Sequence, residues 1–476
     1  MKISSNELFE TLKKLKKNGF VALISLIAED LDPNQADDNR FLLTYTLYNP
    51  VNKEFREIET YANDELTSVS SLYKSANYDE REIYDLFGIK FKNHPNLTRI
   101  FLPKNFEGNP LKNDFKINQA AHPVIQAAEE FSAKFEGEII SKYTPNLGFQ
   151  HKGLEKSAYN KALGEYIPYA GKIDFLSEFF YAEAYISAAE GIFGIIPLKN
   201  AQYTRVLMME LNRISSHLHW LGHFAQSLGF KSQIYQIFSL RNEVLNIFEK
   251  ITGSRIACNY YVLGGVKEKI SNEILNYILD FTKDFNKKLC NLTNCLTKNS
   301  IFTDRTKGLG VITSEIALPY SITGVNLRAN GLPLDFRKEK PYLVYNELEF
   351  SIPTTFEGDC YSRYKLRTDE INISLNLINQ CADWLLANSN EEINLDIDLE
   401  NIKQKEEKAI SWVESPRGLI LCYLKTDDNG KIKRLKWRTP SFYAVQLLEK
   451  IAPGCTLADF NTLYNSLDIS LSEADR

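Results

Sequence analysis

Short apolar runs and one amphipathic segment fill the first 115 residues, a pattern typical of a small domain that mixes helices with strands. Apolar runs at 20–28 (FVALISLIA) and 40–49 (RFLLTYTLYN) suit strands. The segment before them has leucines at helical spacing. These are Leu8, Leu12 and Leu15. We therefore expect a small α/β N-terminal domain over residues 1–115.

Helical periodicity dominates the chain beyond residue 136. Apolar side chains recur near every 3.6 residues in four long stretches, and the predicted helices are 203–228, 232–252, 272–297 and 368–387. Residues 415–440 alternate around Asn429 and Gly430, which predicts a β-hairpin. The polar segment 116–136, with one helical stretch, is the expected connection. The fold class is thus α+β, with a mainly α-helical domain over 137–476 that carries peripheral β hairpins.

Composition and charge exclude several classes of protein. The 476 residues include 44% hydrophobic and 25% charged residues, which is ordinary for a globular chain. The net charge of -5 argues against a nucleic-acid partner. No apolar stretch reaches the roughly 20 residues of a membrane helix, and the charged N-terminus lacks a signal-peptide core. We expect a cytosolic protein that can still dock on a membrane partner.

The seven cysteines are scattered, and no C-x-x-C pair occurs among them. The chain therefore encodes neither a zinc knuckle nor a cysteine-held iron–sulfur cluster, and any redox centre must belong to a partner. Cys290 and Cys295 fall on a predicted helix, and we expect both to be buried thiols, since free cysteine is mostly a small core residue.

Three histidines fall within seven residues, at His217, His219 and His223. His219 and His223 are four apart, so they share a helix face and could bind a metal ion. Neither a glutamate after His219 nor a distant third ligand is evident. A structural or partner-facing role is the favoured interpretation, and we predict no metal site.

Two charged segments leave alternatives open. Residues 78–88 (YDEREIYDLFG) pack five charges beside aromatic residues, either as a solvated turn, which the pattern alone favours, or as a network that locks one subunit against another. Residues 321–367 contain four arginines, Arg328, Arg337, Arg363 and Arg367. They suit an anionic partner or cofactor, and they equally suit salt bridges inside the subunit.

The first charged segment belongs to a longer motif. Residues 80–100 (EREIYDLFGIKFKNHPNLTRI), followed by PLKNDF at 110–115, resemble the C-subunit signature of respiratory complex I. Thr98 and Asn113 replace two arginines of that signature.

The rest of the chain resembles the D subunit of complex I, which is related to the large subunits of nickel–iron hydrogenases. The matching segments are HKGLEK at 151–156, ELNRISSHL at 210–218, GSR at 253–255 with GGV at 264–266, LRANGLPLDFRK at 327–338 and GDCYSRY at 358–364. Hydrogenase large subunits hold their metals with two C-x-x-C pairs, which would fall at 174–177 (DFLS) and 470–473 (SLSE). Without thiolates a nickel–iron site cannot assemble. The resemblance therefore implies a fused C/D subunit with a hydrogenase-like fold.

The resemblance also implies partners and a site. The chain would bind no cofactor itself, and would form a quinone pocket with a B-like subunit that holds the terminal iron–sulfur cluster. H-like membrane subunits and an I-like ferredoxin subunit would be further neighbours, with the chain held at the cytoplasmic side of the cell membrane. Lys152 and Arg255 would lie near the cluster, where positive charge tends to raise its reduction potential.

The expected quinone pocket departs from the family at several positions. The pocket candidates are His122, Gln126, Asp174, Phe175 and Ser227. Gln126, Phe175 and Ser227 stand where the family has histidine, tyrosine and aspartate, and Ala257 stands where it has another histidine. Glutamine and serine hydrogen-bond but do not deliver protons in the useful pH range. Tyr166 or Tyr169 could compensate.

Two hypotheses follow for the function. The first is a working quinone-reducing subunit of an NADH-quinone oxidoreductase that couples electron transfer to ion pumping and is not active alone. The second is a complex-I-like or hydrogenase-related large subunit with a degenerate site, which uses another acceptor or serves coupling or assembly.

Overall fold

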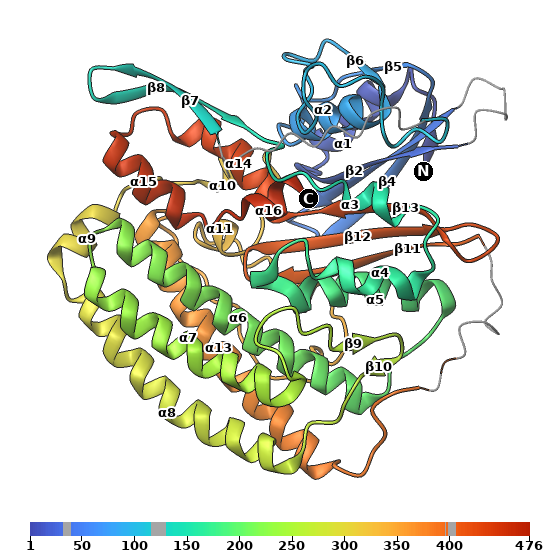
Figure 1. The fold of residues 1–476 in the computed structure, drawn as a ribbon. Helices are drawn as coiled ribbons and strands as arrows, with labels where there is room; N and C mark the ends of the chain where they lie inside the picture. The colour runs from blue at the N-terminus through green and yellow to red at the C-terminus, as the bar shows by residue number, and fades with distance from the viewer. Residues whose placement is uncertain (32–39, 116–129, 396, 398–405) are drawn as a thin grey trace.

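The computed structural model describes residues 1–31, 40–115, 130–395, 397 and 406–476 (Figure 1). The elements of the first 115 residues are β1 (Lys2–Ile3), α1 (Leu8–Lys17), β2 (Ala22–Asp30), β3 (Phe41–Asn49), β4 (Glu54–Ala62), β5 (Glu65–Thr67), α2 (Ala76–Phe87) and β6 (Lys90–Lys92). Then follow β7 (Glu130–Glu136), β8 (Ile139–Asn146), α3 (Leu154–Ala158), α4 (Leu163–Ala170), η1 (Phe175–Ser177), α5 (Glu178–Phe193), α6 (Lys199–Ser227), α7 (Lys231–Thr252), β9 (Tyr261–Val262) and β10 (Gly265–Val266). The last are α8 (Asn272–Thr297), α9 (Ser300–Thr306), α10 (Ser314–Ala317), α11 (Val325–Arg328), α12 (Phe336–Glu339), α13 (Cys360–Ala387), β11 (Lys408–Ser415), β12 (Gly418–Thr426), β13 (Ile432–Arg438), α14 (Pro440–Ile451), α15 (Leu457–Ser466) and α16 (Leu471–Asp475).

A four-stranded sheet forms the centre of the N-terminal part. Its order is β1-β4-β3-β2, with β1 parallel to β4 and the other neighbours antiparallel. The predicted helix is α1, and its three leucines are buried as expected. All nine residues of β2 and of β3 are buried. The continuous apolar runs follow from this burial, because strands covered on both faces need no polar side.

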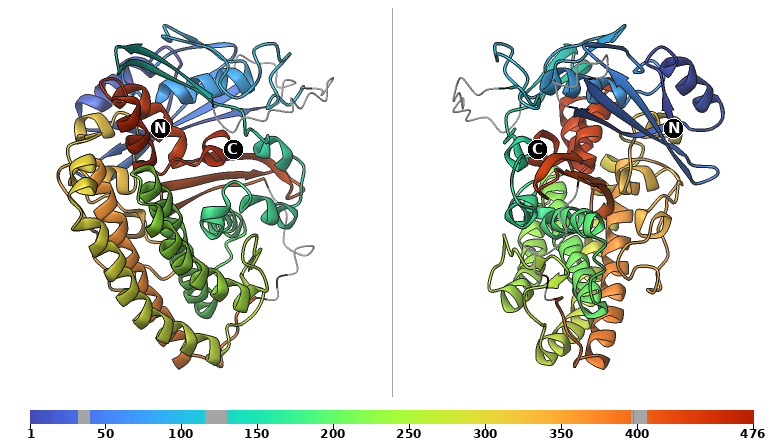
Figure 2. Two further views of the ribbon diagram at one scale, coloured as in Figure 1. Left: turned by 60° about the vertical axis from the view of Figure 1, so that its left-hand side comes forward. Right: turned by 90° about the vertical axis from the view of Figure 1, so that its right-hand side faces the viewer.

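Four long helices make up most of the remaining chain and lie alongside one another (Figure 2). They are α6, α7, α8 and α13, and they confirm the four predicted helices. The fold class, α+β with a mainly helical second part, is likewise confirmed. Helix α13 begins eight residues earlier than predicted, because the Asp359 side chain caps it by accepting a hydrogen bond from the Ser362 N–H at 2.8 Å.

A second sheet of three strands lies between the N-terminal sheet and helix α5 (Figure 1). Strands β12 and β13 are antiparallel and confirm the predicted hairpin, whose turn contains Gly430 with φ of +69°. Strand β11 pairs with β12 and was not predicted as a separate strand. Ile27 of β2 packs with Leu421 and Tyr423 of β12, so the two sheets share apolar contacts.

Residues 130–136, predicted as part of the connection, instead form strand β7 and pair antiparallel with β8. The ring of Phe131 packs 5.4 Å from Tyr143 and 5.6 Å from Phe460, which holds the strand against α15. The helical stretch expected in the connection falls mainly on residues 116–129, outside the described part of the chain. The boundaries at 115 and 137 stay a prediction.

The expectation that Cys290 and Cys295 are buried is wrong, because both side chains are exposed. Helix α8 buries a stripe that includes Leu289, Leu292 and Leu296, and the two cysteines lie outside that stripe. Each cysteine is the immediate neighbour of a buried leucine, Leu289 or Leu296, and is therefore turned by about 100° from it around the helix.

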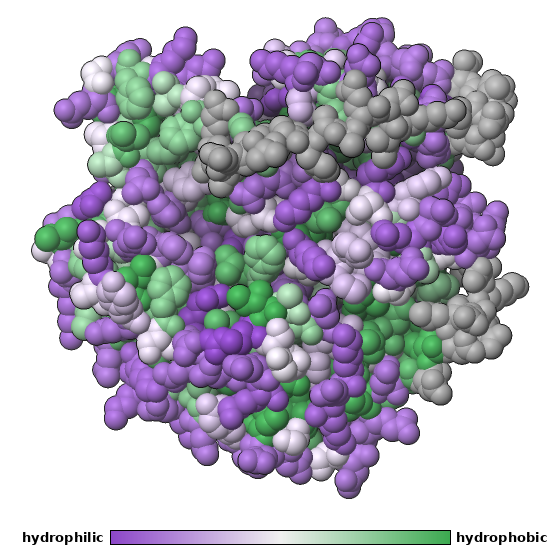
Figure 3. Space-filling model, viewed as in Figure 1, coloured by the Kyte–Doolittle hydropathy of each residue, from purple (hydrophilic) through white to green (hydrophobic). Residues whose placement is uncertain are grey.

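The surface offers no membrane-spanning element in the part of the chain described. No helix there is long and apolar enough to cross a bilayer. Figure 3 shows apolar residues as separate patches among hydrophilic ones on the face viewed in Figure 1.

Candidate functional site

The charged segment at 78–88 is buried in α2. Each of its acidic side chains is at most 3% exposed. They are Asp79, Glu80, Glu82 and Asp85. Asp85 pairs with Arg99 at 2.7 Å and accepts three backbone N–H bonds, from residues 100–102. The interpretation as a solvated turn is wrong, because these side chains are buried and paired inside the chain; a network that locks one subunit against another stays a prediction.

Glu82 is the member of this segment that joins the N-terminal part to the last residues of the chain. One of its oxygens accepts a hydrogen bond from Arg476 Nη2 at 2.6 Å, and the other accepts from Lys436 Nζ. Glu155 lies 3.8 Å from Lys436 and 3.7 Å from Arg476, and pairs with Arg434 at 2.8 Å. Burial favours a raised pKa for Glu155, but these cations lower its pKa to about 2. We call the five side chains the Glu82 clamp.

The four arginines of residues 321–367 point inward. Each is at most 1% exposed, and they are Arg328, Arg337, Arg363 and Arg367. Arg328 pairs with Glu414 at 2.8 Å, and Arg337 pairs with Asp335 at 2.7 Å. Arg367 approaches Asp468 at 3.9 Å, and Arg363 donates to the Ser466 hydroxyl and the Gly358 carbonyl. Of the two alternatives, contacts inside the subunit are therefore observed, as salt bridges for three of the four arginines.

The two segments that align with the hydrogenase cysteine pairs meet around Arg417. Arg417 Nη1 donates to the Asp174 carboxylate at 2.6 Å and to the Ser177 hydroxyl at 2.9 Å. The Ser470 hydroxyl donates to the other Asp174 oxygen at 3.1 Å, and a Glu473 oxygen lies 3.8 Å from Arg417 Nε. Three of the four aligned positions thus lie against a guanidinium group of the chain itself, the fourth, Ser470, binds Asp174, and none of the four carries a thiolate.

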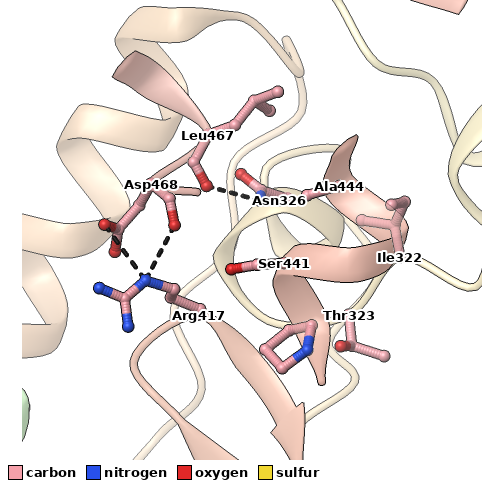
Figure 4. A pocket seen from close by; sticks show the side chains of 9 residues that line it. Ile322, Thr323, Asn326, Arg417, Ser441, Ala444, Leu467 and Asp468 are labelled. Atoms are coloured by element: carbon pink, nitrogen blue, oxygen red, sulfur yellow. Dashed lines mark hydrogen bonds and ion pairs between the residues drawn. The ribbon is translucent and has the colours of Figure 1, made fainter. Parts of the chain in front are cut away.

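Two further carboxyl contacts complete this arrangement. Asp468 lies beside Arg417, with its Oδ1 at 3.4 Å and its carbonyl oxygen at 2.9 Å from Nε (Figure 4). Glu473 accepts hydrogen bonds from the Tyr181 hydroxyl at 2.9 Å and the Ser441 hydroxyl at 2.6 Å. Burial raises the pKa of Glu473 to about 7, against the lowering effect of Arg417. We call Arg417, Asp174, Asp468 and Glu473 the Arg417 cluster.

Phe175 follows Asp174 directly but points outward, with 55% of its surface exposed. The ammonium group of Lys152 lies 5.8 Å from the centre of its ring. A small cavity is lined by Phe175 together with Arg241, Arg255 and Cys258, and it has about 10 Å³ open to the centre of a water molecule. We call these five residues the Phe175 surface. The structure thus brings three predicted site residues together: Lys152, Phe175 and Arg255.

The loop after Arg255 is held by Glu178, the first residue of α5. The Asn259 N–H donates to Glu178 at 3.1 Å, and burial raises the pKa of this carboxyl. Ala257 in this loop has a φ of +58°, a conformation that side chains other than glycine rarely adopt. The residue that aligns with a family histidine is therefore an exposed alanine in a constrained loop.

Ser227 lies apart from the Phe175 surface. It ends α6, and its hydroxyl donates to the Phe224 carbonyl at 2.8 Å. Ser215 of the same helix lines the Phe175 cavity, and a separation of twelve positions along a helix corresponds to roughly 18 Å. His122 and Gln126 lie outside the described residues, and their place in the site stays a prediction.

The three neighbouring histidines differ in environment. His217 is buried and contacts Glu370 at 2.9 Å. The rings of His219 and His223 lie 4.6 Å apart, and both pack against Phe238. Burial lowers the pKa of His219 to about 3. Within the described ranges, no three histidine, cysteine, aspartate or glutamate side chains are grouped to hold a metal ion.

Sequence reasoning does not single out Arg417 or Tyr181. Arg417 lies between Pro416 and Gly418 in the turn from β11 to β12. The only feature of the sequence that could have drawn attention to it is that a large cationic side chain occupies a short turn. Its contact with Asp174 joins residues 243 positions apart, which no local pattern reports.

Comparison with protein families places both parts of the chain. Residues 1–121 match the family described as respiratory-chain NADH dehydrogenase, 30 Kd subunit, and residues 227–476 match the 49 Kd subunit family.

Individual relatives agree with this assignment. The C/D subunit of NADH-quinone oxidoreductase from Shewanella woodyi is 30% identical, across 100% of this chain and 92% of its own length. The C/D subunit from a Sulfurihydrogenibium species is 28% identical, across 97% of this chain and 95% of its own. The D subunit from Geobacillus thermodenitrificans is 36% identical, across 74% of this chain and 96% of its own.

Proposed function

Because the chain belongs to the family of fused C/D subunits of NADH-quinone oxidoreductase, and so is a peripheral-arm subunit of complex I, we propose that its Phe175 surface forms half of a quinone-reducing site. A B-like iron–sulfur subunit supplies the other half, and the complex couples this reduction to ion translocation. The chain lies on the cytoplasmic side of the membrane, against H-like membrane subunits and an I-like ferredoxin subunit.

One observation carries this proposal: an exposed aromatic ring lies among three cationic side chains. Phe175 is 55% exposed, and Lys152, Arg241 and Arg255 surround it. A quinone ring can stack on the phenyl group, and positive charge favours the arrival of electrons. The cavity itself has room for about one water molecule, so a quinone would lie between this surface and a partner rather than inside the chain.

The chain's residues have separate tasks in this scheme. The partner's cluster supplies the electrons when present. Arg241 and Arg255 would donate hydrogen bonds to the carbonyl oxygens of an approaching quinone and favour the negative charge that electrons bring to them. Phe175 excludes water from one face of the ring. It cannot donate a proton, since it lacks the hydroxyl of the family's tyrosine.

A second candidate function draws on that same loss. Phe175, Ser227 and Ala257 all lack the ionisable groups of the family. The chain would then use another acceptor, or would transmit conformational change without redox chemistry at this surface.

Quinone reduction by the purified assembly separates the two functions. An artificial electron donor replaces the natural one, and turnover is compared with and without a quinone-site inhibitor. We expect inhibitor-sensitive turnover, which the second candidate does not produce. A reducible cluster without any such turnover would refute the quinone function.

The variant Phe175→Tyr sharpens this test. The exposed ring leaves room for a hydroxyl group, and a positioned proton donor contributes on the order of 10²-fold or more to a rate. We expect turnover to rise by at least about tenfold. Phe356→Tyr is the matched control, since Phe356 is 80% exposed beside Gly331 and lies outside the Phe175 surface.

A further inference from the structure

The Arg417 cluster holds more negative than positive charge in a buried space. Arg417 faces three carboxyl groups, Asp174 at 2.6 Å, Asp468 at 3.4 Å and Glu473 at 3.8 Å. Two further cations belong to the surroundings, because Arg367 approaches Asp468 at 3.9 Å and the buried Arg438 interacts electrostatically with Glu473. Arg417 lies 2.6 Å from Asp174 and 3.4 Å from Asp468 but 3.8 Å from Glu473, so an ionised Glu473 would be the least compensated of the three buried charges, which is costly in a low-dielectric interior. One of the three groups is therefore expected to carry a proton.

The contacts single out Glu473 as that group. It lies farthest from Arg417, and both of its oxygens are bonded by neutral hydroxyl groups, those of Tyr181 and Ser441. Asp174, by contrast, receives a charged N–H directly. Glu473 is 1% exposed, so bulk water does not solvate its charged form. The raised pKa of its carboxyl, about 7, agrees with this geometry.

Other charged or titratable groups face Glu473 from every element packed around it. They are Tyr181 of α5, Asp174 before η1, Arg417 between β11 and β12, Arg438 of β13, and Asp468 before α16. Asp174 opposes loss of the proton from Glu473, whereas Arg417 and Arg438 favour it. Opposed effects of this kind leave a carboxyl able to bind and release a proton near neutral pH.

A small polar cavity adjoins the Ser441 side of the cluster (Figure 4). It has about 10 Å³ open to the centre of a water molecule, about the room that one water needs. Arg417, Ser441 and Asp468 line it together with Asn326. Asn326 Oδ1 and Asp468 Oδ2 accept no hydrogen bond from the described residues. Two unpartnered acceptors and a hydroxyl group are the surroundings that a buried water requires.

We propose that Glu473 is the proton store of the quinone-reducing site. Its protonated carboxyl gives up the proton toward the Asp174 side of the cluster, next to Phe175, when the quinone is reduced. The O–H bond of Glu473 breaks and an O–H bond forms on a quinone oxygen, while the electrons come from the neighbouring iron–sulfur cluster. A water in the cavity beside Ser441 then relays a proton taken up from bulk solvent to the carboxylate, giving its own proton to Glu473 as it receives the one from solvent, so that no hydroxide is left behind. This inference rests on the proposed quinone function.

Glu473→Gln tests the store directly, since the amide keeps the size and polarity of the side chain but does not titrate. In the intact assembly, infrared spectra recorded against pH should show a protonated carboxyl at neutral pH, and this band should be absent in the variant. Inhibitor-sensitive turnover of the unsubstituted assembly should fall as the pH rises through about 7. In Glu473→Gln that pH-dependent limb should disappear, with turnover lower by on the order of 10²-fold.

A second variant keeps the test informative if the first does not fold. Tyr181→Phe removes a hydrogen bond that favours the carboxylate, so the pKa of Glu473 and the falling limb of turnover should both shift to higher pH. Tyr185→Phe is the matched control, because its hydroxyl donates to the Leu163 carbonyl one turn along the same helix. Its profile should stay in place.

The outcomes are distinguishable. Unchanged pH profiles and an unchanged carboxyl band in Glu473→Gln, or equal profiles for the two tyrosine variants, would overturn the inference. Absence of inhibitor-sensitive turnover in the unsubstituted assembly would instead overturn the quinone function, and with it the delivery of the proton. The infrared band would still decide whether Glu473 holds a proton.

Discussion

Removing the central carboxylate of the Glu82 clamp should loosen the contact between the N-terminal part and the last residues of the chain. In Glu82→Gln, the neutral amide leaves Lys436 and Arg476 with Glu155 alone, at 3.8 and 3.7 Å. Both cations are at most 6% exposed, so water does not compensate them. Breaking a buried pair by removing one partner costs about 3–5 kcal/mol. The two pairs share one carboxylate and are not additive, so we expect a cost of about 4 kcal/mol.

Hydrogen exchange measured by mass spectrometry on peptides from α2 and α16 reports this loss locally. A loss of about 4 kcal/mol in opening free energy corresponds to roughly 10³-fold faster exchange. Peptides from α7 and α8 should exchange as before, because these helices do not contact the clamp. Glu65→Gln is the control in the same part of the chain, since Glu65 pairs with Lys92 at the surface at 2.7 Å. An exposed pair contributes about 0–1 kcal/mol.

Exchange in α2 and α16 that rises less than about tenfold would show that the clamp does not hold these segments, since tenfold corresponds to only about 1.4 kcal/mol. An equal rise in α7 and α8 would also refute the reasoning, because the effect would then be global.

Two further predictions concern buried groups outside the site. Burial raises the pKa of Glu80 to about 8. The contribution of its protonated form to stability is complete below the unfolded pKa of about 4.3 and is lost as the pH rises through 8, by up to about 1.4 kcal/mol per pH unit. In urea titrations, the free energy of unfolding of Glu80→Gln should depend less on pH between 5 and 8, and that of the half-exposed control Glu54→Gln should keep its pH dependence. Gly358 has a φ of +68°, and a Cβ there would lie 2.4 Å from the Ile312 carbonyl oxygen. Gly358→Ala should lower the free energy of unfolding by about 3 kcal/mol. Gly308 is the control, because it has a φ of +72° but an added Cβ there meets no atom within 4 Å, so Gly308→Ala should cost only about 1 kcal/mol. Equal urea midpoints for the two variants would contradict a clash at residue 358.

The fold was largely predictable because its long helices carry a local signal. The helix predicted at 272–297 coincides with α8, since its buried stripe repeats at the helical period over seven turns. The start of α13 was missed, although Asp359 three residues before Ser362 is a capping pattern that sequence alone contains. Strand β11 was missed although its partner β12 follows it after two residues, because helix α5, which packs against it, comes from a distant part of the chain.

The site was less predictable, because its contacts join distant segments. The sequence showed that the acidic residues of 78–88 lie beside aromatic ones, but the pattern favoured a solvated turn and could not show that Lys436 and Arg476 cover Glu82. Likewise, alignment to hydrogenase cysteine positions selected 174–177 and 470–473, yet no pattern predicted that Arg417 would lie between them. The role of a charged residue such as Glu82 or Arg417 can be inferred only after the structure shows which distant residues it contacts.

The contact between Glu82 and Arg476 spans 394 positions, and this separation has a consequence for biosynthesis. A ribosome adds about 5–20 residues per second, so roughly 20–80 s pass between the synthesis of Glu82 and that of its partner. Over that interval the N-terminal part can form its sheet, but the carboxylate of Glu82 has no cation from the end of the chain. We therefore expect α2 to gain its full protection from hydrogen exchange only after Lys436 and Arg476 have been synthesised and have paired with Glu82.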